Sequence, residues 1–426
     1  MTEVPAAEVA SSSSAGPGAK VSAGWIAMVS LANLAVLAGL YAPLQVLLPV
    51  QVENIAGAAG KVAALGWVTG FGSAAALITQ PLVGAFSDRT TSRFGRRRPW
   101  ALGGTVIGAA AVAALAGQRT VAGVIVFWFL AQAGLNVVQA AITAAVPDQV
   151  PVRQRGVASG WVSLQQALGV VVGVALVAVL VTGLASGYVA LAVLVVVLAL
   201  PFVFFTRAPR LAPGDRPPLR WGEFARSFWI SPRRYPDFAW AWGTRFLIVL
   251  SESMAIGYLL YFLQDQVHYT RLFPGQTTED GVFILIIAYA AGVLLSAVTG
   301  GIASDRSGRR KPLVITSGLV MAVPGVLLAL WPTWTVTLIG AVLLGIGFGA
   351  YLAVDLALVT QVLPSETGHA KDLGIINIAS TAPQVIAPAI AAPIVTSLGG
   401  YPALYLTVAV IGVVGSLLVL KIRSVA

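Results

Sequence analysis

The chain has 426 residues, of which 58% are apolar and only 10% charged, with a mean hydropathy of +0.87. In a soluble protein about a quarter of the residues are charged. This composition therefore excludes a soluble protein and predicts a chain that crosses a membrane many times. There is no cysteine, and the two histidines, His268 and His369, fall in predicted loops, so no metal site and no cofactor are expected.

Residues 1–20 are small, polar and of low complexity, and we expect them to form a disordered cytoplasmic tail. The hydropathy pattern predicts an all-α integral membrane fold with two six-helix bundles, 21–206 and 237–426. A basic cytoplasmic linker with an amphipathic helix, 207–236, joins them. The twelve expected spans are 24–50, 62–86, 99–117, 120–146, 156–183, 187–206, 237–263, 281–303, 312–331, 334–362, 373–397 and 402–421.

Lysine and arginine gather on one side of these spans. With the N-terminus inside, 22 of the 26 fall in cytoplasmic segments and three, Lys61, Arg119 and Arg271, fall in outside loops. This asymmetry predicts a multi-pass protein of the cell (plasma) membrane with both termini cytoplasmic. It also explains the net charge of +10 without a nucleic-acid partner.

Two charge clusters repeat at an offset of 217 positions, SDRTTSRFGRRRPW from Ser87 and SDRSGRRKP from Ser304. A repeat of six spans plus six places a substrate site near the membrane midplane between the halves, which rock around it. Basic runs of this kind indicate a nucleic-acid partner, an anionic lipid surface or a conformational latch. The candidate residues in and just before the clusters are Gly84, Asp88, Arg89, Arg93, Gly95, Arg96, Arg97, Asp305, Arg306, Arg309 and Arg310.

The segment GAFSDRTTSRFGRRRPW resembles the loop between helices 2 and 3 of the major facilitator superfamily. SRFGRRRP, YLLYFLQD (Tyr258–Asp265) and AKDLGIINIASTAPQ (Ala370–Gln384) resemble the sucrose/proton symporter-like members of its glycoside–pentoside–hexuronide branch. The resemblance implies that the two charge clusters form a cytoplasmic gate, in which Asp88 holds the neighbouring half when the transporter faces outward. The acidic residue in the fourth span and the arginine in the fifth span of plant sucrose symporters are missing here.

Three ionisable residues lie deep within predicted spans: Arg245, Glu252 and Asp355. Each costs about 2.5–3.5 kcal/mol at a helix centre, so such residues face a cavity or a partner. Arg245 and Asp355 lie at similar depths, about 12–14 Å from the cytoplasmic face at about 1.5 Å per residue, and we expect them to pair. Glu252, near the midplane, is then the leading proton carrier. The alternative is a static network of all three.

Neutral amides form the rest of the expected pathway. Gln132, Asn136 and Gln139 fall at i, i+4 and i+7 of the fourth span. Amides supply hydrogen-bond donors and acceptors, which suits an uncharged polyhydroxylated substrate, and the alternative is that they bind one helix to another. The candidate substrate-pathway residues are Asn33, Gln132, Asn136, Gln139, Gln165, Gln166, Asn377 and Gln384.

These features predict a secondary active transporter that works by alternating access, with proton-coupled transport of a sugar or glycoside as the leading function. One alternative is an exporter of an amphipathic natural product or drug-like compound, although the drug-antiporter motif G-x-x-x-G-P-x-x-G-G is missing from 156–183. Further alternatives are sodium as the coupling ion and a non-transporting membrane scaffold. An enzyme is not expected, because no nucleophile–base or metal constellation falls within the spans. We expect a monomer in the lipid bilayer that binds a small-molecule substrate.

Overall fold

The computed structural model describes residues 21–151, 168–181, 183–206, 222, 231–307, 310–362 and 369–423. The expected tail 1–20 and the linker up to residue 230, apart from residue 222, lie outside these residues, as do Gln165, Gln166 and Arg309. The side chains of Asp305 and Asn377 are also outside the description.

Long apolar helices make up the first half of the chain. The first helix begins after Ser22, whose hydroxyl oxygen accepts a hydrogen bond of 3.2 Å from the backbone N–H of Trp25, as an N-cap residue does. Pro43 cannot donate a helical hydrogen bond, and a π-helical turn begins there. The elements are α1 (Ala23–Ala42), η1 (Pro43–Leu47), α2 (Leu48–Ser87), α3 (Arg98–Leu115), α4 (Val121–Gln149), the helix Leu168–Leu180 with its π-helical end η2 (Leu176–Leu180), and α6 (Leu184–Phe205).

The second half is built in the same way. Its first helix starts with Pro236, a residue that suits the first helical position because its missing N–H would have no intrahelical partner. The elements are α8 (Pro236–Gly257), α9 (Leu259–Phe262), η4 (Leu263–Val267), α10 (Tyr269–Leu272), α11 (Thr278–Ser307), α12 (Arg310–Leu330), α13 (Trp334–Gln361), α14 (His369–Ser397), α15 (Gly400–Leu418) and η5 (Val419–Lys421).

The helices of the described residues follow the predicted order of spans. Nine are long and apolar enough to cross a membrane, and α8 with Leu259–Val267 makes a further one, bent by 48°. The first, Ala23–Ser87, has 65 residues and holds both of the first two expected spans. It breaks at Gly57, whose φ of 69° and ψ of 173° suit a glycine. Leu168–Leu180 is the described part of the expected fifth span. The all-α membrane fold is therefore confirmed.

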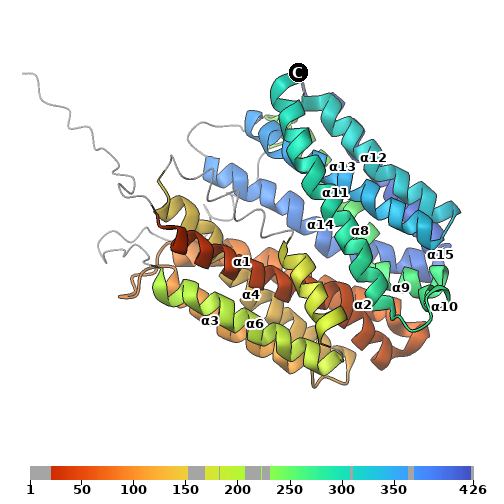
Figure 1. The fold of residues 1–426 in the computed structure, drawn as a ribbon. Coiled ribbons are helices and arrows are strands. Elements are labelled where there is room, and N and C mark those ends of the chain that lie inside the picture. The colour runs from red at the N-terminus through yellow and green to blue at the C-terminus, as the bar shows by residue number, and fades with distance from the viewer. Residues whose placement is uncertain are drawn as a thin grey trace, which may run out of the picture.

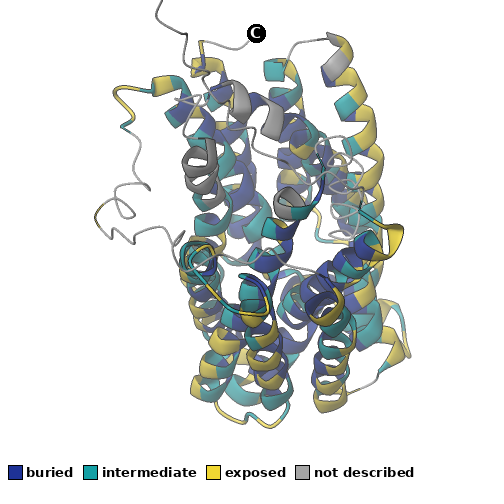
Figure 2. Ribbon diagram, turned by 90° about the vertical axis from the view of Figure 1, so that its left-hand side faces the viewer, coloured by how far each residue is buried: buried dark blue, intermediate teal, exposed yellow. Residues whose placement is uncertain are grey.

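Exposed residues gather on the outer faces of the helices, whereas buried ones lie toward the inside (Figure 2). The outer residues include large apolar side chains: Trp67 is 64% exposed, Leu295 70% and Phe205 74%. Scattered apolar residues are normal on a soluble protein, but a surface this rich in them is not. These outer faces therefore contact lipid.

The two halves form two groups of helices that meet along α2 and α14 (Figure 1). Their backbones approach closely at Gly66, where a Cβ would lie 3.2 Å from the Cβ of Ala392 and 3.1 Å from Oη of Tyr258. This seam lies toward the end of the bundle that contains Lys61, which we call the Lys61 end. The opposite end carries the loop between α2 and α3, and we call it the basic-loop end.

Close packing of α11 on α13 positions the aromatic residues of the interior. A Cβ on Gly345 would lie 2.2 Å from the backbone oxygen of Tyr289, and a Cβ on Gly349 would lie 2.3 Å from that of Val293. Glycine at these positions lets the two helix backbones touch. Tyr289 of α11 and Phe348 of α13 consequently stack, with ring centroids 6.4 Å apart.

Candidate functional site

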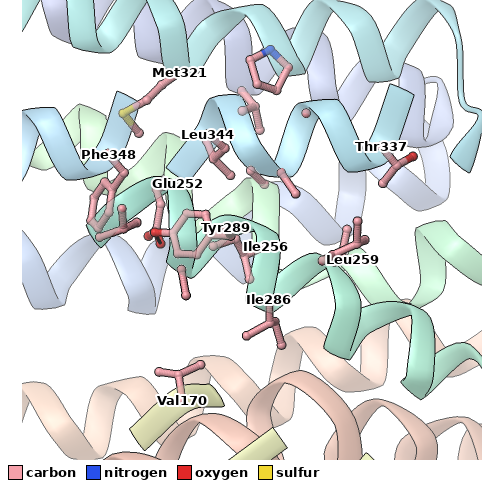
Figure 3. A pocket seen from close by; sticks show the side chains of 18 of the residues that line it. Val170, Glu252, Ile256, Leu259, Ile286, Tyr289, Met321, Thr337, Leu344 and Phe348 are labelled. Carbon is pink, nitrogen blue, oxygen red and sulfur yellow. Dashed lines mark hydrogen bonds between the residues drawn. The ribbon is translucent and has the colours of Figure 1, made fainter. Parts of the chain in front are cut away.

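A cavity of about 610 Å³ lies between the two halves. Tyr41, Gln45 and Val170 line it from the first half, and the rest of its wall comes from α8, α9, α11, α12, α13 and α15. Most of the wall is apolar, with Ile256, Leu344 and similar side chains pointing into the space (Figure 3). A volume of this size is in the range that holds a drug-sized molecule.

Glu252 is the one charged residue among those that line the cavity in the described part of the chain. It projects from α8 toward Tyr289 (Figure 3), whose hydroxyl donates a hydrogen bond of 3.2 Å to Oε1. Gln45 of the first half also lines the cavity, and its buried amide oxygen has no hydrogen-bond partner within the described residues. The cavity thus presents one carboxylate in largely apolar surroundings.

Arg245 and Asp355 form the ion pair that their depths predicted. A guanidinium nitrogen of Arg245 donates to Oδ2 of Asp355, and its Nε donates to the hydroxyl of Ser380 at 2.7 Å. Tyr351 donates to the other oxygen of Asp355 at 2.5 Å. This cluster ties α8 to α13 and α14. Neither charge lines the cavity, so in the described residues Glu252 stands apart from the pair.

Comparisons with known proteins agree with this architecture. A family model described as the Major Facilitator Superfamily matches residues 24–288 and 241–425. The chain belongs to the Major Facilitator Superfamily. It is a multi-pass membrane transporter and not an enzyme.

Two solved structures share the superfamily fold. The crystal structure of the nucleoside transporter NupG aligns with a TM-score of 0.75 at 14% identity, covering 93% of this chain and 99% of that one. The human organic anion transporter MFSD10 (TETRAN) aligns with a TM-score of 0.68 at 18% identity, over 92% and 98% of the two chains. At these identities the likeness concerns the fold alone.

A curated relative matches a shorter segment. The protein described as the uncharacterized MFS-type transporter YfkL, from Bacillus subtilis (strain 168), is 35% identical over 97 residues. The match spans 23% of this chain and 24% of that relative.

The predicted amide residues lie elsewhere in this superfamily fold. Asn136 donates from Nδ2 to the side chain of Gln132 at 3.0 Å and accepts from Gln80 of α2 at 2.8 Å. Gln139 has a buried amide oxygen without a hydrogen-bond partner in the described residues. Asn33 is buried in α1, whereas Gln384 is exposed on α14. None of the five predicted residues, Asn33, Gln132, Asn136, Gln139 and Gln384, lines the cavity. Their role in the pathway stays a prediction.

The basic loop between α2 and α3 is held by contacts within the first half. Asp88 pairs with Arg97 at 2.8 Å, and Arg97 also donates to the hydroxyl of Ser87 at 2.6 Å. Arg98 donates to the backbone oxygen of Thr206 at 2.6 Å, which anchors the loop to the end of α6. Gly95 has a φ of 94°, a conformation that favours glycine.

The remaining gate candidates of the described residues lie at separate places along α2, the loop, α11 and α12. Arg89 donates to the backbone oxygen of Ala85 at 2.7 Å, and exposed Arg93 lies 4.8 Å from the ring centroid of Phe94. Gly84 lies on α2, and a Cβ there would meet no atom within 4 Å. Arg96 lies in the loop, exposed Arg306 ends α11, and Arg310 begins α12. The gate role of the motif stays a prediction.

Sequence reasoning missed two groups of residues. The first group is Tyr41, Tyr289 and Tyr405, which line the cavity but fall in apolar runs that give no signal of their function.

The second is the ion pair of Lys61. The sequence places Lys61 in an outside loop, but it lies within α2 with a side chain only 4% exposed. A lysine beside long apolar stretches, with Glu53 eight residues before it, was the available signal for a buried ion pair.

Asp355→Asn should strongly destabilise the folded protein, because it removes one partner of a buried ion pair and leaves Arg245 without its carboxylate. Such losses cost about 3–5 kcal/mol. Thermal unfolding in detergent measures the effect. Asp88→Asn is the matched control, since the side chain of Asp88 is 51% exposed and such pairs contribute about 0–1 kcal/mol.

Replacing both partners with leucine should recover part of the lost stability, because no unpaired charge remains. Equal, small effects of Asp355→Asn and Asp88→Asn would contradict a structural role for the buried pair.

Proposed function

We propose that this superfamily member is a secondary active transporter that works by alternating access, with the 610 Å³ cavity as its substrate site and Glu252 as its proton carrier. The observation that carries this proposal is that, in the described part of the chain, Glu252 is the one charged residue of a largely apolar cavity between the two halves. A carboxyl group there can be protonated or charged, so a change in its protonation state can be coupled to the binding or release of a substrate.

Closure at one end supports alternating access. The α2–α14 seam and the contacts around Lys61 join the two halves at the Lys61 end. At the basic-loop end, Asp88 pairs with Arg97 of its own loop. We therefore assign this structure to a state that is closed at the Lys61 end, and we propose that Asp88 engages the other half when that end opens.

The distribution of lysine and arginine supports an orientation. We propose that the basic-loop end and both termini face the cytoplasm of a cell whose plasma membrane holds the protein, because cytoplasmic loops carry an excess of these residues. In this proposal the closed Lys61 end faces outward, the state is inward-facing, and the transporter works as a monomer.

The cavity wall favours an amphipathic organic compound as the substrate. Sugars require hydrogen bonds around most of their surface, and desolvating unmatched hydroxyls is costly. Besides Glu252, the polar side chains on this wall are Gln45, Thr337 and three tyrosines, Tyr41, Tyr289 and Tyr405. An apolar molecule with one or two polar groups matches such a wall better.

A sugar or glycoside moved with a proton is the second candidate. The likeness of SRFGRRRP and YLLYFLQD to sucrose-symporter-like sequences favours it. The Gln80–Gln132–Asn136 cluster also offers amides, although their hydrogen bonds join α2 to α4.

Glu252→Gln should abolish proton movement coupled to substrate, because glutamine is similar in shape but does not titrate at neutral pH. Proteoliposomes that enclose a pH-sensitive dye measure this movement, with ethidium, chloramphenicol and sucrose as probes of three substrate classes. Glu279→Gln at the start of α11 is the matched control, since Glu279 does not line the cavity.

Undiminished coupling in the Glu252→Gln variant would show that another group carries the proton. No proton movement with any of the three probes would contradict the proposed function itself.

A further inference from the structure

The charge balance of the cavity limits the kind of substrate that it can hold. A cation in an apolar, water-excluding site needs a counter-charge, and Glu252 is the one charged lining residue in the described part of the chain. The other titratable groups on the wall are Tyr41 of α1, Tyr289 of α11 and Tyr405 of α15. Tyrosine is neutral near pH 7, so one negative charge at most is available.

The wall around this carboxylate also suits an organic cation. Tyr289 and Phe348 stack beside Glu252, and aromatic faces attract cations. Gln45 also lines the cavity, and its amide oxygen, which has no hydrogen-bond partner in the described residues, is a hydrogen-bond acceptor of the kind that a protonated amine requires. Together these groups form a site for the charged end of an otherwise apolar molecule.

Resting on the transport function proposed above, we infer that the substrates are amphipathic organic monocations and that each is exchanged for one proton at Glu252. When the cation binds, the Glu252 carboxyl group releases its proton to water on that side and the carboxylate pairs with the cation. On the other side a proton binds the carboxylate and the cation leaves. The cavity is electrically neutral in both loaded states, so one turnover moves no net charge.

Electroneutral exchange has a direct test in proteoliposomes with an acidic interior and a membrane potential clamped by potassium and valinomycin. Ethidium uptake above that of protein-free liposomes should require the pH gradient and should be equal with and without the potential. A step that moved one uncompensated charge would change the accumulation ratio about tenfold for each 59 mV.

The Glu252→Gln variant should lose ethidium uptake. Chloramphenicol, which is amphipathic but neutral, should not be exchanged for protons by the wild-type protein.

The outcomes separate this inference from the proposed function. Proton movement with sucrose or chloramphenicol but not ethidium would overturn cation exchange and leave proton-coupled transport standing. Ethidium uptake that scales with the potential would overturn electroneutrality. No proton movement with any probe would overturn the transport proposal as well.

A second inference rests on a different cluster, at the Lys61 end. Nζ of Lys61, from the first half, lies 2.8 Å from Oδ1 of Asp265 and 3.1 Å from the side-chain oxygen of Gln264, both in the second half. It lies 4.6 Å from the ring centroid of Tyr261, whose hydroxyl donates to the backbone oxygen of Pro49 at 2.8 Å. These contacts cross from one half to the other.

Each charge in this cluster also has a partner within its own half. Lys61 bonds to Glu53 at 3.1 Å, and Asp265 accepts a hydrogen bond from Tyr401 at 2.8 Å. If the halves part, Lys61 keeps Glu53 and Asp265 keeps Tyr401. A buried charge left without a partner would make opening prohibitively costly. These second contacts avoid that cost.

We propose that the Lys61–Asp265 pair is a reversible latch that closes this end of the pathway. Asp265→Asn should weaken the closed state, whereas Glu53→Gln removes a carboxylate at a similar distance but within the first half, and should leave closure intact. The two variants remove carboxylates that lie 2.8 and 3.1 Å from Nζ of Lys61, the first across the halves and the second within the first half.

A single cysteine in place of Gly66 reports the opening, because the chain has no cysteine of its own and Gly66 lies in the α2–α14 seam. Asp265→Asn should raise its rate of maleimide labelling in proteoliposomes roughly fivefold or more, and Glu53→Gln should not. Equal labelling rates in the two variants would overturn the latch. This result does not depend on any substrate.

Discussion

A charge buried in a membrane bundle must have a counter-charge or reach a polar cavity, and the arrangement of this protein follows from that constraint. Arg245 meets Asp355, and Lys61 meets Glu53 and Asp265. Both groups of charges hold helices together, the first within the second half and the second between the halves. Glu252 accepts a hydrogen bond from a tyrosine hydroxyl but pairs with no cation in the described part of the chain, and it faces the cavity instead. The buried charge with the least compensation is therefore the one placed where a substrate can reach it.

The two halves contribute unequally to the central site. The first half supplies Tyr41, Gln45 and Val170, whereas the second half supplies Glu252 and most of the apolar wall. Glycine contacts between α11 and α13 place Tyr289 against Glu252. Parting of the halves at the Lys61 end would thus expose a wall whose chemistry is already assembled in the second half. In the proposed transport cycle, the first half would close the cavity, and the second half supplies most of the wall that a substrate would meet.

The fold could be predicted from the sequence because helix length, apolar composition and the repeated charge clusters are each local patterns. The Arg245–Asp355 pair could be predicted as well, since two charges at the same depth in two spans have few other partners. The composition of the cavity wall could not be predicted. The amides of α4 are expected there because they are polar. However, Gln132 and Asn136 bond to each other and Asn136 bonds to Gln80 of α2, and tyrosines within apolar runs line the cavity instead. The sequence places Lys61 in an outside loop, because the low hydropathy of a charged segment is the same in a loop and in a helix that buries an ion pair.

Alternating access, as proposed here, requires the halves to part along the α2–α14 seam in every turnover, and a reversible disulfide across that seam tests this requirement. The Cβ atoms at Gly66 and Ala392 would be 3.2 Å apart, close to the separation in a disulfide. A cysteine pair at these positions should stop ethidium–proton exchange on oxidation and regain it on reduction. The pair Gly412→Cys with Ala322→Cys, whose Cβ atoms would be 3.8 Å apart within the second half, should transport in both states. Full transport by the cross-linked seam pair would contradict this requirement.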